Sequence, residues 1–226
     1  MSAGEVLYRA RQVLTKRRVK YGLLSVRSSE KPRVLAGVPI PSIRVADRVR
    51  QQYLHEADEV IAGTVKLFTS HRFELGSIPN WNRDPLTGVV APDTFSGDIM
   101  LTDRAVVGDI KYVWELNRQL HLVRLAQAFA LSGSQHYLEA LIRQLDSWLA
   151  QCPPFFGPNW ASSLEASIRL INWSLIWNMI GGWSSAAFTT TDVAGTDSTF
   201  IQGKNYLVVT ANTDNGGNFN IAYRGI

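Results

Sequence analysis

The sequence predicts a mainly α-helical protein built from antiparallel helix pairs, followed by a short tail that is β-prone or disordered. In the second half of the chain, apolar residues recur at helical spacing in three segments, and turn-forming residues separate these segments by short loops. Helices joined by short loops pack antiparallel. After Trp183 threonine, glycine, asparagine and serine dominate. We therefore expect a helical domain over residues 1–183 and a tail over residues 184–226, which is either a β fragment or sequence foreign to the domain.

The first hundred residues predict two helices and a long loop. Ser2 and Glu5 fit a capping box that starts the first helix. Prolines exclude a long helix over residues 28–43, and a second helix is expected over residues 51–65. Residues 68–104 are dense in glycine, proline, asparagine and aspartate, which predicts a loop. A loop of this length inside a compact domain is usually functional.

Three amphipathic helices are expected after this loop. The first covers residues 109–131 and stops at Gly133, a favoured residue just past a helix end. Ser134 is the expected N-cap of a second helix over residues 135–151. The third covers residues 163–179, before a pair of glycines. The first two helices should form a helical hairpin.

Composition and charge bound the class of protein. The 226 residues are 46% hydrophobic, which is enough to bury a sizeable core, and the net charge of +4 could steer an anionic partner to the surface. Nucleic acid is set aside, because the basic cluster of the first helix lacks interleaved exposed aromatics and no DNA-reading motif follows it. Cys152 is the only cysteine, so no intrachain disulfide or multi-cysteine metal site can form. The charged start predicts neither a signal peptide nor a membrane span, and the localisation stays undetermined.

One stripe of the expected helix over residues 109–131 carries groups suited to a sugar ligand. Trp114, Asn117, Arg118 and His121 follow one another at i, i+3, i+4 and i+7, which places them on one face. An indole offers a stacking surface for a sugar ring, and a guanidinium pairs in a forked geometry with a carboxylate or sulfate. The alternative is a solvated helix face with the indole at the edge of the core.

A second group of candidates surrounds the start of the third helix. Asn159 and Trp160 lie in the preceding loop, and Glu165 and Arg169 are spaced i, i+4 on the helix. An amide there could hydrogen-bond a substrate carboxyl group. The alternative for Glu165 and Arg169 is an ordinary surface ion pair, worth a few tenths of a kcal/mol. Nucleophile-elbow, phosphate-loop and zinc-protease motifs are missing, so we expect neither metal nor cofactor.

Three separated motifs, in this order, resemble the amino-terminal domain of the heparinase II/III-like polysaccharide lyases. They read WNRDPLTG from Trp81, GDIKYVWELNRQLHLVRLAQAFALSG from Gly108 and NWASSLEASIRLINW from Asn159. The resemblance covers roughly residues 1–182 and implies an incomplete α/α toroid that packs against a β-sandwich. It also implies binding of uronate-containing acidic polysaccharides in the cleft between them, and their cleavage by β-elimination.

The resemblance also implies roles for the candidate residues. Asn159 matches the asparagine that neutralises the uronate carboxyl group, and is the expected catalytic residue. The expected substrate-binding residues are Trp114, Asn117, Arg118, His121, Trp160, Glu165 and Arg169. Trp114, Arg118, His121 and Asn159 should then face one shared concavity.

Two functions stay open at this stage. The tail stands where the family's catalytic tyrosine segment is expected, so neither Tyr206 nor Tyr223 receives a catalytic role. The chain is interpreted as a polysaccharide lyase, or the substrate-binding fragment of one. The alternative is a non-catalytic helical module for glycan binding or assembly.

Overall fold

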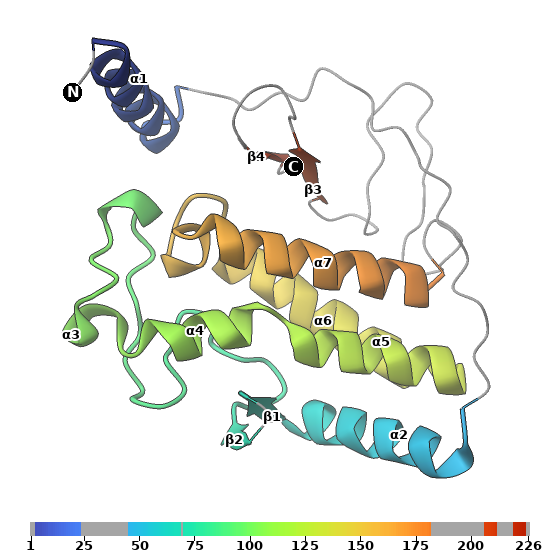
Figure 1. The fold of residues 1–226 in the computed structure, drawn as a ribbon. Coiled ribbons are helices and arrows are strands. Elements are labelled where there is room, and N and C mark those ends of the chain that lie inside the picture. Colours follow the sequence, from blue (N-terminus) through green and yellow to red (C-terminus); the bar gives the residue numbers. More distant parts are fainter. Residues whose placement is uncertain (1–2, 24–44, 69, 182–205, 212–218, 225–226) are drawn as a thin grey trace.

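The computed structural model describes residues 3–23, 45–68, 70–181, 206–211 and 219–224, and it is mainly helical, as predicted (Figure 1). The helices are α1 Ala3–Lys20, α2 Asp47–Ala62, α3 Arg104–Val107, α4 Ile110–Asn117, α5 Leu120–Ser132, α6 Gln135–Gln151 and α7 Ser163–Met179. The strands are β1 Thr64–Leu67, β2 His71–Glu74, β3 Tyr206–Ala211 and β4 Phe219–Arg224, and two short 3-10 helices are η1 Ser96–Asp98 and η2 Pro158–Trp160.

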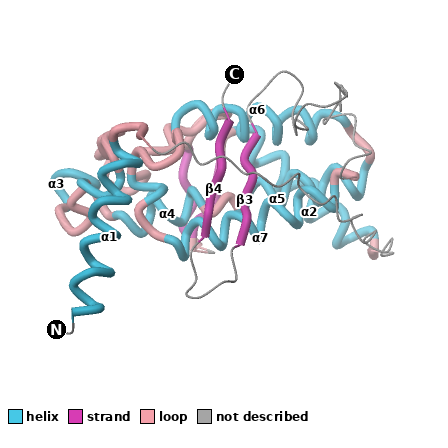
Figure 2. The backbone as a smooth tube through the Cα atoms, turned by 90° about the horizontal axis from the view of Figure 1, so that it is seen from above, coloured by secondary structure: helices cyan, strands magenta, loops and turns pink. Residues whose placement is uncertain are grey.

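Helix α5 lies at the centre of the main core. It packs against α2, α6 and α7, and these four helices run along roughly one direction (Figures 1 and 2). Its Leu122 and Leu125 are fully buried, and burial of such a side chain contributes about 2 kcal/mol. Gly133, at a left-handed φ of 72°, ends α5, and Ser134 leads directly into α6. The predicted helical hairpin is therefore present, with α6 beginning and ending where expected.

The single helix predicted over residues 109–131 is wrong, because the chain breaks between α4 and α5. Gln119 adopts a left-handed conformation with φ 61°. Side chains of α7 bond to the break: Asn172 Nδ2 donates to the Arg118 carbonyl at 2.6 Å, and the Trp173 indole N–H donates to Gln119 Oε1. Because the helical repeat is interrupted at residues 118–119, the i+7 spacing no longer places His121 on the stripe of Trp114.

Helix α7 has the predicted bounds, but its buried face is mostly polar. Glu165, Arg169 and Asn172 are each less than 5% exposed. Leu164 and Ile171, which supply part of the apolar periodicity, are 61% and 60% exposed. Burial of charged groups on this scale requires partners in the protein interior. The polar face of α7 must therefore pair with groups on other elements of the fold.

Two antiparallel hairpins complete the described fold. Strands β1 and β2 pair from Thr64 with Glu74 to Leu67 with His71, where the sequence predicted the end of a helix and then loop. Helix α2 also starts and ends earlier than the expected residues 51–65. Strands β3 and β4 pair within the tail, in agreement with its β-prone prediction. No helix of the described ranges has the length and apolar character needed to cross a membrane.

A buried aspartate organises the long loop before α4. Asp84, fully buried, accepts hydrogen bonds from the backbone N–H groups of Leu86 at 2.8 Å and Asp109 at 2.7 Å, and from the Thr87 hydroxyl. Asp109 is the N-cap of α4, so this carboxylate fixes the start of that helix against the loop. Gly108 lies directly beside it, at φ 69°. The motif that begins at Trp81 is thus a structural clamp on α4.

Candidate functional site

The polar face of α7 meets the end of α4 and the turn η2 in one buried network. The backbone carbonyl of Trp81 accepts hydrogen bonds from Asn117 Nδ2 at 2.7 Å and from Asn159 Nδ2 at 3.3 Å. Asn117 Oδ1 in turn accepts from the Trp148 indole N–H at 2.7 Å. Both asparagines are at most 1% exposed. The side-chain amides of Asn117 and Asn159 therefore connect the loop after β2 with helices α4 and α6 and with η2.

Arg169 fills the centre of this network. Its guanidinium donates to the backbone carbonyls of Asn117 at 3.1 Å and Asn159 at 3.0 Å. It also lies over the Trp148 ring, 4.6 Å from the centroid, and near the Trp160 ring, at 5.4 Å. Burial lowers the pKa of Arg169 to about 10, so the group still carries its charge at neutral pH. A fixed positive charge thus lies within hydrogen-bond distance of the Asn159 backbone carbonyl.

Arg118 and Glu165 form an ion pair between α4 and α7. Arg118 Nε and Nη2 donate to the two Glu165 oxygens at 2.7 and 2.9 Å, and Nη1 donates to Glu115 at 2.6 Å. The hydrogen bond that Arg118 donates to Glu165 is the main cause that raises the pKa of Arg118. The alternative of a surface pair between Glu165 and Arg169 is wrong, because both residues are buried and Glu165 binds Arg118 instead.

Asn159 is enclosed, and its amide is aimed into the protein. Besides Trp81, its Nδ2 donates to Asn82 Oδ1 at 3.0 Å and lies 3.2 Å from the Cys152 sulfur. Its Oδ1 is buried and has no hydrogen-bond partner. Burial raises the pKa of the Cys152 thiol to about 12, so this cysteine stays protonated and unreactive. A buried amide oxygen without a partner is uncommon and costs stability.

The two candidate tryptophans are half-buried and fixed by their indole N–H groups. Trp114 donates to the Pro158 carbonyl and Trp160 to the Cys152 carbonyl, each at 3.0 Å. Both acceptors lie within seven residues of Asn159, on the loop that carries it. The two indoles therefore border the Asn159 turn, and neither residue is fully buried.

His121 contacts the same network through the Trp81 ring and not through Arg118 or Asn159. It stacks on Trp81 with an interplanar angle of 22°, and its Nε2 lies 3.2 Å from Gln144 Oε1. Burial lowers the pKa of His121 to about 4, so the ring is neutral at pH 7. A buried neutral histidine is a packing element here, and its titration bears on stability.

We expect this histidine to destabilise the protein in acid. The unfolded chain takes up a proton at the ordinary pKa of 6.5, and the folded chain only near 4. Stability is therefore complete above pH 6.5 and falls by about 3 kcal/mol as the pH drops towards 4. Urea unfolding from pH 7 to 4.5 measures this fall, which His121→Gln should reduce. The same substitution at the exposed His136 should keep the wild-type slope; an equal effect of both would contradict this account.

The structure thus brings the eight predicted residues into one assembly, in which most of their polar groups bond to backbone carbonyls or to residues outside the set. Trp114, Arg118, His121 and Asn159 were expected to face one shared concavity, but His121 and Asn159 are buried. Trp114, Arg118 and Trp160 keep part of their surface accessible. Sequence reasoning missed Trp81, Asn82 and Trp148 as partners of the site. Trp81 and Asn82 open the first motif, so their place in it was the available signal. Among the described residues, no group of three histidine, cysteine or acidic side chains could hold a metal ion.

A comparison with known protein families shows the family to which this chain belongs. The family described as heparinase II/III N-terminus matches residues 8–222. The chain belongs to the heparinase II/III N-terminus family. The resemblance drawn from the three motifs is confirmed, and the match continues beyond residue 184 into the segment predicted as a tail. Comparisons with curated proteins and with solved structures give no significant match.

Within a heparinase II/III N-terminal domain, the network explains why the three motifs occur together. The first motif supplies the Trp81 carbonyl and Asn82, the second Asn117 and Arg118, and the third Asn159 with the buried face of α7. Each motif contributes a partner that the others require. Three segments far apart in sequence therefore form one hydrogen-bonded unit.

Proposed function

We propose that this heparinase II/III N-terminal domain binds uronate-containing acidic glycans and acts in their cleavage by metal-independent β-elimination. The observation that carries the proposal is the family match over residues 8–222, which relates the chain to polysaccharide lyases. The candidate residues of the proposal are the ones that the three motifs bring together. The proton donor and acceptor of the reaction are not assigned to residues of this chain.

The accessible faces of Trp114 and Trp160 are the proposed platform for the sugar. Indole rings present large, rigid apolar faces, and their N–H groups are already satisfied by the Asn159 loop. A sugar ring on this platform would bring its carboxylate to the loop that carries Asn159. Positioning of this kind lowers the entropic cost of reaching the transition state.

Asn159 and Arg169 are the proposed source of electrostatic stabilisation. Removal of the proton α to a uronate carboxylate builds negative charge on that group, which nearby donors and cations stabilise. Arg169 holds the Asn159 carbonyl at 3.0 Å and remains charged at neutral pH. The Asn159 amide must exchange an acceptor such as Asn82 Oδ1 for the substrate carboxylate. The proposed role therefore includes a local rearrangement of this turn.

A second candidate is a non-catalytic module for glycan binding or assembly. This function is favoured because the polar groups of the network already have partners in the protein. Arg118 is paired with Glu115 and Glu165, and Asn159 is fully buried. In that case acidic glycans bind but no unsaturated uronate forms. Binding without turnover by the wild-type protein would select this function over the first.

The role of Asn159 is tested by comparison with its neighbour Asn82. Asn159→Ala should lower kcat on a uronate glycan about 100- to 1,000-fold, the usual cost of one lost donor to a developing oxyanion. Asn82→Ala removes an acceptor from the same network, so it should lower the melting temperature while kcat stays within about tenfold of wild type. Ultraviolet absorbance of the unsaturated product gives kcat, and thermal unfolding checks the fold. Equal kcat losses in both variants would make Asn159 a structural residue.

A further inference from the structure

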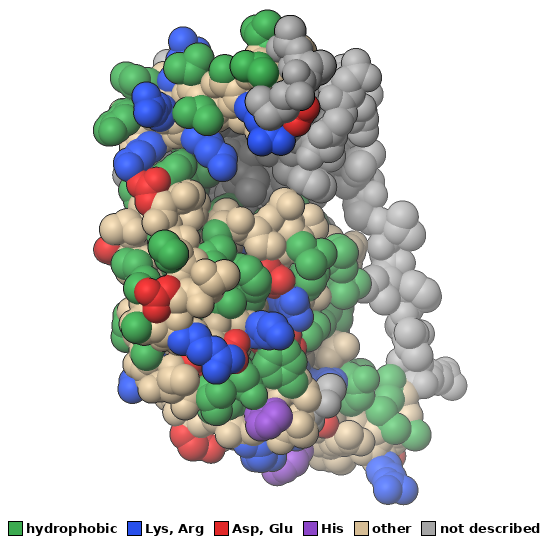
Figure 3. Space-filling model, turned by 60° about the vertical axis from the view of Figure 1, so that its left-hand side comes forward, with side chains coloured by type: hydrophobic (Ala, Val, Ile, Leu, Met, Phe, Trp, Pro, Cys, Tyr) green, Lys and Arg blue, Asp and Glu red, His purple; other side chains and the backbone are tan. Residues whose placement is uncertain are grey.

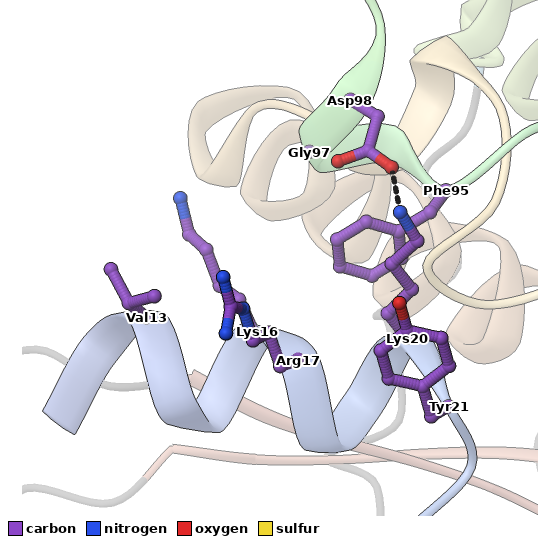
Figure 4. Close-up of a pocket in the computed structure, with 8 residues that line it drawn as sticks. All are labelled: Val13, Lys16, Arg17, Lys20, Tyr21, Phe95, Gly97 and Asp98. Carbon is purple, nitrogen blue, oxygen red and sulfur yellow. Dashed lines mark hydrogen bonds and ion pairs between the residues drawn. The ribbon is translucent and has the colours of Figure 1, made fainter. Parts of the chain in front are cut away.

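A pocket outside the candidate site lies between α1 and the loop that carries η1. Its volume is about 580 Å³, within the range of roughly 300 to 1,000 Å³ typical of small-ligand sites. Residues of α1 and the turn after it form one wall, and the η1 loop forms the other (Figure 4). The lining residues are Val13, Lys16, Arg17, Lys20, Tyr21, Phe95, Gly97 and Asp98.

The pocket carries an excess of positive charge. Lys20 binds Asp98 across it, and that contact raises the pKa of Lys20. Lys16 and Arg17 rise from the same side of α1, and no carboxylate of the described ranges forms an ion pair with them. Figure 3 shows the basic side chains of α1 gathered above a hollow in this face. Two unneutralised cations thus border an open space.

Aromatic side chains give the pocket a floor and an edge. Phe95 is buried, and its ring lies against Gly97, where an added Cβ would come within 2.8 Å of it. Tyr21 is 67% exposed at the mouth. Lys20 Nζ lies 5.9 Å from the centroid of the Tyr21 ring, and Lys16 and Arg17 lie about one turn earlier on α1. This arrangement fits an anionic group attached to a ring with an apolar face.

The η1 loop connects this pocket to the Asn159 turn. Ser96 N–H donates to the Phe155 carbonyl, and Gly157 N–H donates to the Thr94 carbonyl, both at 2.8 Å. The Phe95 and Phe156 rings meet edge to face, with centroids 6.3 Å apart. The segment that forms these contacts leads directly to Asn159. The η1 loop therefore joins one wall of the pocket to the turn that carries Asn159.

We propose that the α1–η1 pocket is a second subsite for the acidic glycan. Lys16 and Arg17 bind the carboxylate or sulfate group of one sugar unit, and Tyr21 stacks against its ring. This inference rests on the proposed function, because it assumes that the domain binds acidic glycans. Glycan binding then extends over several sugar units, from the Asn159 turn to the α1–η1 pocket.

The test measures binding by calorimetry, with tetrasaccharides of heparan sulfate and alginate as probes. Lys16→Ala/Arg17→Ala should weaken binding at least tenfold and reduce its salt dependence, because two anion contacts are lost. Arg9→Ala/Arg11→Ala removes the same charge from α1 outside the pocket, and should change the affinity less than about twofold. Tyr21→Ala should weaken binding about fivefold through loss of stacking. Circular dichroism confirms that each variant stays helical.

The outcomes separate this inference from the proposed function. If the wild type binds a tetrasaccharide and Lys16→Ala/Arg17→Ala binds it equally well, the pocket is not a subsite, while the proposed function stands. If both double variants lose the same affinity, the effect of Lys16 and Arg17 is a general attraction by charge, which also overturns the subsite. An oligonucleotide of equal charge that displaces the tetrasaccharide overturns the sugar assignment. No binding of either tetrasaccharide by the wild type overturns the pocket together with the proposed function.

Discussion

Replacement of Arg169 by methionine should lower the free energy of unfolding by about 3 to 5 kcal/mol. Methionine keeps much of the volume beside the Trp148 and Trp160 rings, but it cannot donate to the Asn117 and Asn159 carbonyls. Two buried carbonyl groups then lose their partners, which outweighs the relief of removing a desolvated charge. Chemical denaturation followed by tryptophan fluorescence measures the change.

The same substitution at Arg143 is the control. Arg143 is exposed on α6, so Arg143→Met should change stability by less than about 0.5 kcal/mol. A variant Arg169→Met that is as stable as wild type, or more stable, would show that burial of the charge costs more than its hydrogen bonds contribute. The network would then not be what holds α4, η2 and α7 together.

Replacement of Gly108 by alanine should cost at least about 3 kcal/mol, which reflects overpacking beside a left-handed backbone. An alanine Cβ would overlap with the carboxylate of the buried Asp84 and come within 2.7 Å of Thr87 Oγ1. Gly133→Ala is the control for the positive φ alone: Gly133 has φ 72° and ψ 0°, against ψ −144° at Gly108, and no atom lies within 4 Å of its added Cβ. It should cost only about 1 kcal/mol.

Thermal unfolding of the two glycine variants gives the comparison. A Gly108→Ala variant that loses no more than Gly133→Ala would mean that the Asp84 clamp adapts freely. The start of α4 would then not depend on the first motif, and the motif would need another explanation.

The helices α6 and α7 could be predicted to the residue because their periodicity and their end signals agree. The break at Gln119 could not, since neither glycine nor proline stands there. Its left-handed backbone is stabilised by Asn172 and Trp173, which lie more than fifty residues further on. Contacts between distant segments override local helix propensity at such a point. The β1–β2 hairpin was missed because strands of four residues give little periodic signal.

Some residues of the site could also be predicted, but the partners that they bind could not. Spacing placed Glu165 and Arg169 on one helix face and suggested that they pair with each other. In the structure Glu165 pairs with Arg118, and Arg169 binds backbone carbonyls. Backbone acceptors carry no sequence signature, so a side chain that serves them cannot be recognised from residue types. The same reason hides the double role of the Trp81 carbonyl.

In the proposed function, this heparinase II/III N-terminal domain acts on acidic glycans through their uronate carboxylates. The most direct measurement incubates the wild-type protein with heparan sulfate or alginate, and with the same polymers after chemical reduction of their carboxyl groups. Release of unsaturated uronate products is followed by ultraviolet absorbance and mass spectrometry. We predict saturable product formation from a native polymer and none from its reduced form. Binding that does not distinguish the two forms, together with no product from either, would contradict the claim.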